Sequence, residues 1–437
     1  MKKIYFKNLN EYLNKEITIE GFVDSVRDLQ YVQFLVIRDI SGKVQVTIEK
    51  NEGNSKLNEI VSNLMTESTV KITGKLLENE KVKLNGMELI PSEIIVTSEC
   101  LEELPLNYKD SKSALLDTRL NYRFLDLRSE KNVLMFKVQT ALIAAMREFM
   151  TNNNFIEIHT PKLIGTASES GAEVFEVGYF GRKAYLAQSP QFYKQMALAS
   201  GFDRVFELAP AFRAEKSNSY RHTTEITMLD IEFSYIESYQ DVMDFEEDLL
   251  IAGISRVKEL YGEEIKELFG VDVVVPTKPF PRIKLEELYK ELELKFGFKM
   301  DFEDVGDMNS ESEKLASQYI KEKYGHEFVF VTDFSANKRA FYHMRENGVP
   351  QGFDLIWKGC EITTGAQREH RYEILKEQAK EKGLGEDIKF YLEFFKYGCP
   401  PHGGFAIGVD RITMLLLETG SLKETMFIFR GPNRIEP

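Results

Sequence analysis

The segment from Phe212 to Phe233, FRAEKSNSYRHTTEITMLDIEF, carries charged side chains in a pattern that predicts a binding site. Its two ends have strand character and are joined by a polar loop, which indicates a hairpin. Because side chains alternate between the faces of a strand, we expect Arg213 and Glu215 on one face and Asp230 and Glu232 together on the return strand. Burying unpaired charges is costly, so this set indicates a polyanionic or zwitterionic ligand.

A second candidate is the segment KAYLAQSPQFYKQM, which predicts a strand followed by a helix. Ser189 is a suitable N-cap, and Pro190 suits the first helical position. Gln191 and Lys194 are three residues apart and therefore share a helical face. Ser-Pro alone indicates only good capping and a lone lysine is usually solvated, so these residues alone leave the function open.

Two carboxylates lie in the segment FDLIWKGCEITTGAQREHRYEIL, around a predicted turn at Lys358-Gly359. Asp354 and Glu361, with the hydroxyl of Thr364, are oxygen ligands of the kind that Mg²⁺ takes when it also binds a phosphate. Arg368 follows and could form a bidentate pair with a carboxylate. The alternative is that these are ordinary surface charges of an acidic protein.

The segment YGCPPHGGFAIGVDRITMLLLE predicts a glycine-rich strand that leads into an apolar helix. Gly403, Gly404 and Gly408 would let a ligand approach the backbone closely, and Asp410 and Arg411 would lie at the helix start. The pattern is not the phosphate loop GxxxxGK[ST], which the chain lacks, so a nucleotide bound here would need another architecture.

The histidines do not have metal-ligand spacing. We expect His343, His370 and His402 to be structural or surface residues, and His222 is the exception because it follows Arg221.

Two predicted modules must position these residues. Residues 17–97 contain five short strands with a helical segment after the third, which predicts an OB-type barrel; the alternative is another small β-barrel. We expect this first domain over residues 1–100, a linker or hinge over 101–130, and a second domain of α+β class over 131–437. In the second domain, FIEIHTPKL predicts a strand, and helices are predicted near 131–151, 238–262, 284–296, 310–324, 372–382 and 387–397.

Composition narrows the class of protein. The chain has 437 residues, 43% of them hydrophobic, and a formal net charge of −14, which argues against a protein that coats nucleic acid nonspecifically. We expect neither a membrane span nor a secretory signal, because the sequence lacks a long apolar run and an apolar signal core. Cys100, Cys360 and Cys399 are far apart and odd in number, which favours a reducing cytoplasm over a disulfide framework.

Together these segments resemble the class II aminoacyl-tRNA synthetases. FIEIHTP is similar to motif 1, with Pro161 at a homodimer interface, while FRAEKSNSYRHTTEITMLDIEF and GGFAIGVDRI are similar to motifs 2 and 3. LDTRLNYRFLDLR and YLAQSPQFYKQM resemble the aspartyl-tRNA synthetases of archaeal and eukaryotic type. The compact length fits the archaeal type, whose catalytic domain is an antiparallel sheet flanked by helices.

The resemblance implies ATP and Mg²⁺ as cofactors and gives roles to the charged residues. Arg213 would hold the α-phosphate, and Glu215 would approach the adenine or the tRNA end. Arg221 and His222 would bind the γ-phosphate, and Arg411 would cover the adenine and phosphates. Asp354 and Glu361 would bind Mg²⁺ with the Thr364 hydroxyl. The residues that the resemblance makes catalytic are Arg213, Glu361 and Arg411.

For the amino acid, the resemblance implies that Lys194 and Arg368 neutralise the aspartate side chain with help from Gln191. Asp230, Ser168 and Glu169 would surround the ammonium group, with Thr364 nearby. In the barrel, Arg27, Phe34 and Gln45 match positions that contact anticodon bases, which fits stacking and base-edge hydrogen bonding. The alternative for Phe34 is the barrel core. Ile226 departs from the family, which often has an aromatic residue stacked on the adenine there.

The expected reaction is the ATP-dependent attachment of L-aspartate to tRNA(Asp), and the sequence leaves open whether tRNA(Asn) is also a substrate. The first rival is an asparaginyl-tRNA synthetase, in which Lys194 would be a buried charge without a partner. The second is a catalytically silent RNA-binding paralogue, which we expect to have lost Arg213, Glu361 or Arg411. A third, an asparagine synthetase of related fold, would not need residues 1–100.

Overall fold

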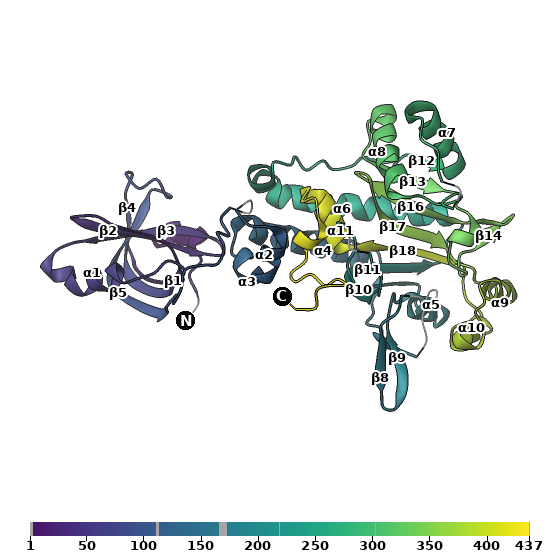
Figure 1. Cartoon of the computed structure of the whole chain (residues 1–437), viewed down its shortest axis with the longest axis horizontal. Helices are drawn as coiled ribbons and strands as arrows, with labels where there is room; N and C mark the ends of the chain where they lie inside the picture. Colours follow the sequence, from purple (N-terminus) through teal and green to yellow (C-terminus); the bar gives the residue numbers. More distant parts are fainter. Residues whose placement is uncertain (1–2, 111–112, 166–172, 218, 302, 437) are drawn as a thin grey trace. The chain divides into compact units, whose positions relative to one another are not determined.

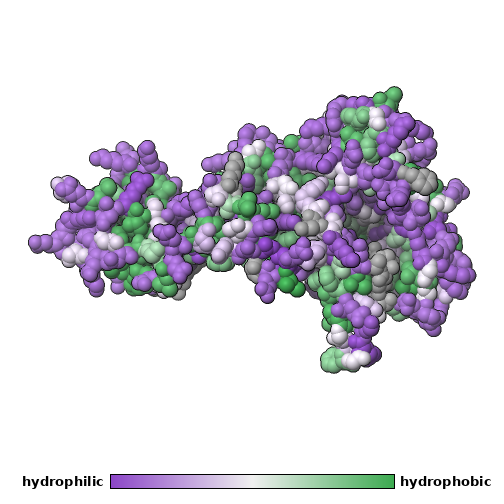
Figure 2. Space-filling model, in the orientation of Figure 1, coloured by the Kyte–Doolittle hydropathy of each residue, from purple (hydrophilic) through white to green (hydrophobic). Residues whose placement is uncertain are grey.

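The computed structural model describes residues 3–110, 113–165, 173–217, 219–301 and 303–436. The chain forms two compact units, Met1–Asn107 and Tyr108–Pro437 (Figure 1). Hydrophilic side chains cover most of the face seen in Figure 2, as expected for a chain with 29% charged residues. Among the described residues, no helix is long and apolar enough to cross a membrane.

The first unit is a closed barrel with strand order β1-β2-β3-β5-β4. Its strands are β1 (Glu16–Asp28), β2 (Val32–Asp39), β3 (Gly42–Glu49), β4 (Thr69–Glu78) and β5 (Met87–Ser98), and helix α1 (Ser55–Ser62) lies between β3 and β4. Alternate residues, such as Leu35 and Ile37 on β2, fill the core. The prediction of five strands with a helix after the third is confirmed.

The second unit is built on an eight-stranded sheet with the order β12-β13-β16-β17-β18-β11-β10-β6 (Figure 1). Its strands are β6 (Ile156–Glu157), β10 (Arg204–Phe212), β11 (Glu225–Ser234), β12 (Arg282–Lys284), β13 (Phe328–Thr332), β16 (Gly352–Trp357), β17 (Cys360–Gln367) and β18 (His402–Gly408). The strand pairs from β13 to β10 are antiparallel, as expected, whereas the edge strands β12 and β6 pair in parallel with their neighbours.

Helices cover the sheet, and smaller strands border it. The helices are α2 (Leu116–Asn121), α3 (Arg123–Asp126), α4 (Glu130–Asn152), α5 (Gln191–Ala199), α6 (Tyr239–Phe269), α7 (Leu285–Phe296), α8 (Ser310–Tyr324), α9 (Tyr372–Glu381), α10 (Lys389–Phe395), α11 (Val409–Leu417) and α12 (Leu422–Thr425). The smaller strands are β7 (Leu163–Ile164), β8 (Glu176–Tyr179), β9 (Arg182–Leu186), β14 (Arg345–Glu346) and β15 (Val349–Pro350). Helices α2 and α3 lie within the predicted linker 101–130, which is therefore partly helical.

The main core forms where α4, α6 and α11 pack on one face of the sheet. Val138 on α4 and Ile254 on α6 belong to the same buried cluster as Ile231 on β11 and Phe405 on β18. Because side chains alternate along a strand, Asp230 and Glu232 on β11 lie on the opposite face of the sheet. The apolar face thus packs against the helices, and the opposite face carries the polar side chains.

One row of paired residues runs across five strands of this polar face. Asp354 on β16 pairs with Thr364 on β17, which pairs with Ala406 on β18. Ala406 pairs with Asp230 on β11, and Asp230 pairs with Glu207 on β10. The register therefore aligns the predicted metal ligands and the predicted ammonium ligand in a single row.

Two local predictions were wrong. Strand β10 ends at Phe212, so Arg213 and Glu215 do not alternate on a strand as expected. The Ala214 N–H donates to the carbonyl of Glu173 instead of to a strand partner, and this takes the chain out of the sheet. Within FIEIHTPKL, only Ile156–Glu157 and Leu163–Ile164 are strands, and they belong to different sheets.

Candidate active site

Lys194 lies between two buried carboxylates. Its Nζ atom is 3.1 Å from Oδ1 of Asp230 and 3.3 Å from Oε2 of Glu232, and its side chain is 1% exposed. Burial raises the pKa of Asp230, although Lys194 opposes the change. Burial would also raise the pKa of Glu232, but Arg368 and Lys194 outweigh it and lower that pKa to about 2. The predicted face shared by Asp230 and Glu232 is confirmed.

Arg368 completes this cluster from the end of β17. Its Nε donates to Oε1 of Glu232 over 2.9 Å, and its Nη2 donates to the carbonyl of Gly404 over 2.9 Å. Gln191 lies between them, because its Nε2 is 3.4 Å from Glu232 and its Oε1 is 3.5 Å from Arg368. Two cations and two anions therefore balance in a buried space, which suits a zwitterionic ligand that exchanges partners with them.

The glycine-rich strand β18 was expected to let a ligand approach its backbone at Gly403 and Gly404, but protein atoms fill the space beside both glycines. A Cβ atom on Gly404 would lie 2.4 Å from Oε2 of Glu232, so the space beside this glycine is filled by a side chain of the protein. A Cβ atom on Gly403 would lie 2.8 Å from Val242 on α6. Neither glycine leaves room for a ligand, and that part of the prediction was wrong.

Gly408 is the glycine that faces the predicted nucleotide site. A Cβ atom on Gly408 would lie 3.5 Å from the Cβ of Arg411 and 4.0 Å from Cγ2 of Ile226. Arg411 lies in the first turn of α11, as expected. Ile226 on β11 and Arg411 on α11 thus lie beside the same glycine from different elements.

The arginines predicted to bind phosphates lie in and beside the loop between β10 and β11. Arg213 is 37% exposed, and its Nη1 is 3.9 Å from Glu215. Glu215 is also 3.8 Å from Nε2 of His222. Burial lowers the pKa of His222, and although Glu215 opposes this, Arg221 and Arg411 add to the lowering.

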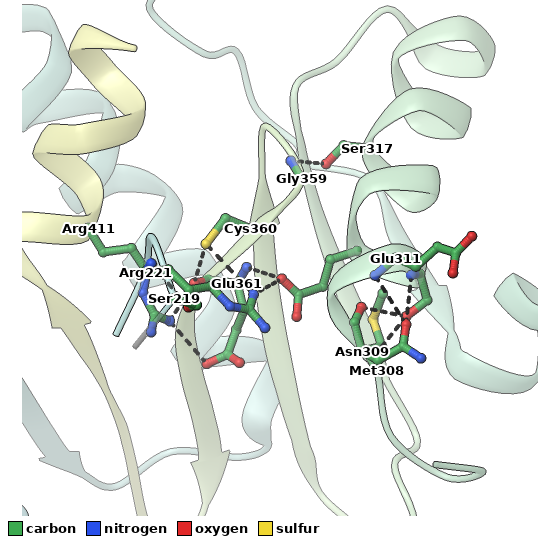
Figure 3. A network of polar contacts seen from close by, with 12 residues as sticks. Ser219, Arg221, Met308, Asn309, Glu311, Ser317, Gly359, Cys360, Glu361 and Arg411 are labelled. Carbon is green, nitrogen blue, oxygen red and sulfur yellow. Dashed lines mark hydrogen bonds and ion pairs between the residues drawn. The ribbon is translucent and has the colours of Figure 1, made fainter. Parts of the chain in front are cut away.

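Arg221 and Arg411 converge beside Cys360 and Glu361 (Figure 3). Arg221 forms an ion pair with Glu313 on α8, and its Nη1 is 3.9 Å from the Cys360 sulfur. Nη1 of Arg411 donates to the Glu361 carbonyl over 2.7 Å. Burial would raise the pKa of Glu361, but Arg411 and Arg339 outweigh it, and the net pKa is lowered. This carboxylate is thus kept ionised among cations.

Asp354 has a partner that the sequence did not indicate. Nη1 and Nη2 of Arg339 donate to its two oxygens over 2.7 and 2.6 Å, which is a bidentate pair. Burial raises the pKa of Asp354 to about 6, and Glu361 adds to this while Arg339 opposes it. The Thr364 hydroxyl donates to Glu361 over 3.1 Å.

The predicted metal site therefore brings together two carboxylates and a hydroxyl. No group of three or more His, Cys, Asp or Glu side chains suited to a metal lies in the part of the chain that the structure describes. The oxygen donors do fit Mg²⁺, which commonly binds one or two protein carboxylates together with phosphate oxygens. Arg339 competes for Asp354, so Glu361 is the more available of the two carboxylates.

In the barrel, the predicted anticodon residues share an outer surface. Arg27 pairs with Phe34 across β1 and β2, and Gln45 on β3 pairs with Val36 on β2. Phe34 is half-buried and is absent from the apolar core cluster, so the alternative that it is a core residue is wrong. Nε2 of Gln45 donates to the Thr47 hydroxyl over 3.2 Å. Ser168 and Glu169 lie outside the described residues.

Sequence reasoning gave no role to Glu232, Glu313 or Arg339. Glu232 was noticed on the hairpin, and the signal for its role was its position two residues after Asp230. Arg339 and Glu313 reach their partners from distant segments, and no spacing in the sequence marks them.

The chain matches the family model for class II tRNA synthetases (D, K and N) over residues 116–429. It belongs to that family. Residues 17–97 match the OB-fold nucleic acid binding domain, which confirms the predicted barrel of this synthetase.

The relatives of this class II synthetase include archaeal proteins of similar length. It is 40% identical over 438 residues to a Pyrococcus furiosus protein named aspartate–tRNA(Asp) ligase, covering 99% of each chain. It is also 40% identical to an Aeropyrum pernix protein named aspartate–tRNA(Asp/Asn) ligase, covering 96% of this chain and 95% of that one. The predicted resemblance to the archaeal type is confirmed.

Among solved structures, the synthetase is similar to asparaginyl-tRNA synthetase from Pyrococcus horikoshii complexed with asparaginyl-adenylate. The TM-score is 0.91 at 30% identity, with 100% of both chains covered. Because this likeness is to an asparaginyl enzyme, the fold does not decide which amino acid is bound. That choice depends on the side chains of the site.

Proposed function

We propose that this class II synthetase activates L-aspartate with ATP and transfers it to tRNA(Asp). The observation that carries the proposal is the buried cluster in which Lys194 and Arg368 meet Asp230 and Glu232. The substrate ammonium would pair with Asp230, which Lys194 holds in the free protein. The substrate side-chain carboxylate would then replace Asp230 as a partner of Lys194 and would join Glu232 as a partner of Arg368. Asparagine also has the ammonium group that pairs with Asp230, but its side-chain amide has no charge to offer Lys194 and Arg368. Aspartate is therefore the favoured substrate.

The adenylation step needs no general base from the protein, because the aspartate α-carboxylate is already a nucleophile. One of its oxygens attacks the α-phosphorus, the bond to the bridging oxygen breaks, and pyrophosphate leaves. Arg213 would stabilise the charge that grows on the α-phosphate, while Arg221, His222 and Arg411 hold the other phosphates. A ribose hydroxyl of the terminal tRNA adenosine then attacks the adenylate carbonyl, and AMP leaves with the electron pair.

Glu361, Asp354 and Thr364 would hold Mg²⁺. When bound, this ion neutralises phosphate charge and orients the leaving pyrophosphate. Its support here is the pair of carboxylates, one of which has a raised pKa because of burial and the charge of the other. A nearby cation relieves such repulsion.

The barrel would bind the anticodon through Arg27, Phe34 and Gln45, and the named relatives make tRNA(Asn) a second candidate substrate. We also propose a homodimer with Pro161 at its interface, and a cytoplasmic location, which suits the free cysteines Cys100, Cys360 and Cys399. In this proposal, residues 1–100 form the anticodon-binding domain, residues 101–130 the linker or hinge, and residues 131–437 the catalytic domain.

ATP–pyrophosphate exchange with aspartate and asparagine in parallel tests the amino acid. We expect exchange with aspartate, and exchange with asparagine alone would overturn the assignment. Charging of purified tRNA(Asp) and tRNA(Asn) then identifies the tRNA. The silent-paralogue rival predicts no exchange with either amino acid, although Arg213, Glu361 and Arg411 are all present.

A further inference from the structure

A buried chain of polar side chains lies behind Gln191. Gln195 follows Gln191 by one turn of α5, and neither Gln195 nor His402 has exposed surface. Gln195 contacts three groups: its Nε2 is 2.9 Å from Nε2 of His402, and its Oε1 accepts from Tyr391 over 3.0 Å and from Gln191 over 3.1 Å. These groups come from α5, α10 and β18, so the chain links three elements.

The direction of every hydrogen bond in this chain follows from one backbone carbonyl. Nδ1 of His402 is 2.8 Å from the carbonyl of Pro400, which only accepts, so Nδ1 must carry the proton. Burial lowers the pKa of His402 to about 4, although Glu232 opposes this, and the ring is therefore neutral at pH 7. Its Nε2 is then an acceptor, and the group of Gln195 that faces it must be the NH₂.

The consequence reaches the candidate substrate site. With its NH₂ on His402, Gln195 presents its oxygen to Tyr391 and Gln191. Gln191 must then point its own NH₂ toward Gln195 and Glu232, which leaves its carbonyl oxygen toward Arg368. A reversed Gln191 amide would set an NH₂ against the guanidinium and an oxygen against the Glu232 carboxylate, and both contacts are repulsive.

We propose that Gln195 is a positioning residue for amino-acid recognition: held in one orientation by His402, it acts together with Glu232 and Arg368 to fix the orientation of the Gln191 amide. The inference rests on the proposed function, because it assumes that Gln191 and Arg368 contact the substrate side chain. Gln195 itself touches no substrate in this scheme and acts through Gln191.

The test measures aspartate KM and kcat by ATP–pyrophosphate exchange, with thermal unfolding for each variant. Gln195→Leu removes the acceptor for Gln191, and we expect KM to rise about tenfold, which corresponds to the loss of one buried hydrogen bond, with kcat changed less than about twofold. Gln195→Glu keeps an oxygen toward Gln191 and shares a proton with His402, so KM should stay within about threefold of wild type. If Gln195 only filled space, Gln195→Leu, which has a similar volume, would keep KM near the wild-type value.

Tyr391→Phe is the matched control, because it removes one donor to Gln195 and leaves the His402 bond that sets the direction. Its KM should change less than about twofold. If Gln195→Leu does not fold, His402→Phe replaces it; this variant keeps a ring beside Phe395, and KM should rise at least about fivefold.

A wild-type KM in folded Gln195→Leu, or an equal rise in Tyr391→Phe, would overturn the inference. The same holds for an unchanged KM in His402→Phe. Failure of the proposed function looks different, because the wild-type enzyme would then show no exchange with aspartate at all.

Discussion

Replacing Lys194 with methionine is the sharpest test of how the site recognises a carboxylate. Methionine keeps an unbranched side chain but removes the ammonium that lies 3.1 Å from Asp230 and 3.3 Å from Glu232. In the free protein, Asp230 then loses this ion pair, while Glu232 keeps its pair with Arg368. Removing one partner of a buried ion pair costs about 3–5 kcal/mol, and protonation of Asp230, whose pKa burial already raises, recovers part of this. We therefore expect a less stable protein that still folds.

Lys194→Met should also weaken aspartate activation, separately from its effect on folding. Truncating one side of a buried charge pair weakens a complex by about 2–5 kcal/mol, which corresponds to a loss in kcat/KM of roughly 30- to 5000-fold. ATP–pyrophosphate exchange measures this loss, and urea unfolding measures the stability. Adding Asp230→Asn to Lys194→Met should restore part of the stability and none of the activity, because it removes a stranded charge but also the ammonium ligand.

A matched control separates the site from a general effect of losing a lysine. Lys183 is 72% exposed and forms a surface ion pair with Glu176 over 3.0 Å. Surface pairs contribute little, so Lys183→Met should keep wild-type activity and unfolding temperature. If Lys194→Met retains kcat/KM for aspartate within about threefold of wild type, the carboxylate-binding role and the estimate above are both refuted.

Three further predictions address other parts of the protein. Arg221→Gln, which breaks the pair with Glu313, should raise KM for ATP about tenfold or more and leave KM for aspartate unchanged in the same exchange assay; parallel changes in both would contradict separate half-sites. Burial raises the pKa of Glu246 from 4.5 to about 8, so the folded state holds a proton that the unfolded state releases. The free energy of unfolding should therefore fall as pH rises from about 4.5 toward 8, by up to about 1.4 kcal/mol per pH unit, and urea titrations of Glu246→Gln should lack this slope. Phe34→Ala should reduce tRNA charging about tenfold by loss of one stacked base while exchange without tRNA is unchanged, and an equal loss in exchange would refute an anticodon role.

Much of the fold was predictable because local signals agreed with the tertiary structure. Helix α8 begins and ends at the predicted residues 310 and 324, and Asn309 caps its first turn. The predicted turn at Lys358-Gly359 is confirmed: it joins β16 to β17, and the φ values of 48° and 78° are those of a two-residue hairpin turn. Arg213 shows where such reasoning fails: its segment has strand character, but a non-local hydrogen bond from Ala214 takes the backbone out of the sheet.

The site was predicted less completely because its partners come from separate elements. Gln191 and Lys194 could be placed on one helical face from spacing alone, and both are buried there. The bidentate pair between Arg339 and Asp354 joins a loop to a strand, and neither residue has a local pattern that indicates the other. His402 was expected to be structural, and its effect on Gln191 became visible only when the order of donors and acceptors was known.

The row of paired residues from Asp354 to Asp230 sets the distance between these two carboxylates. The two residues are three strand steps apart, and strands are spaced by about 4.8 Å, so about 14 Å of sheet separates the proposed Mg²⁺ ligand Asp354 from the proposed ammonium ligand Asp230. Backbone hydrogen bonds, which side-chain changes do not alter, fix this length. A substitution at Asp230 or Asp354 would therefore change the chemistry of one proposed half-site without changing its distance from the other.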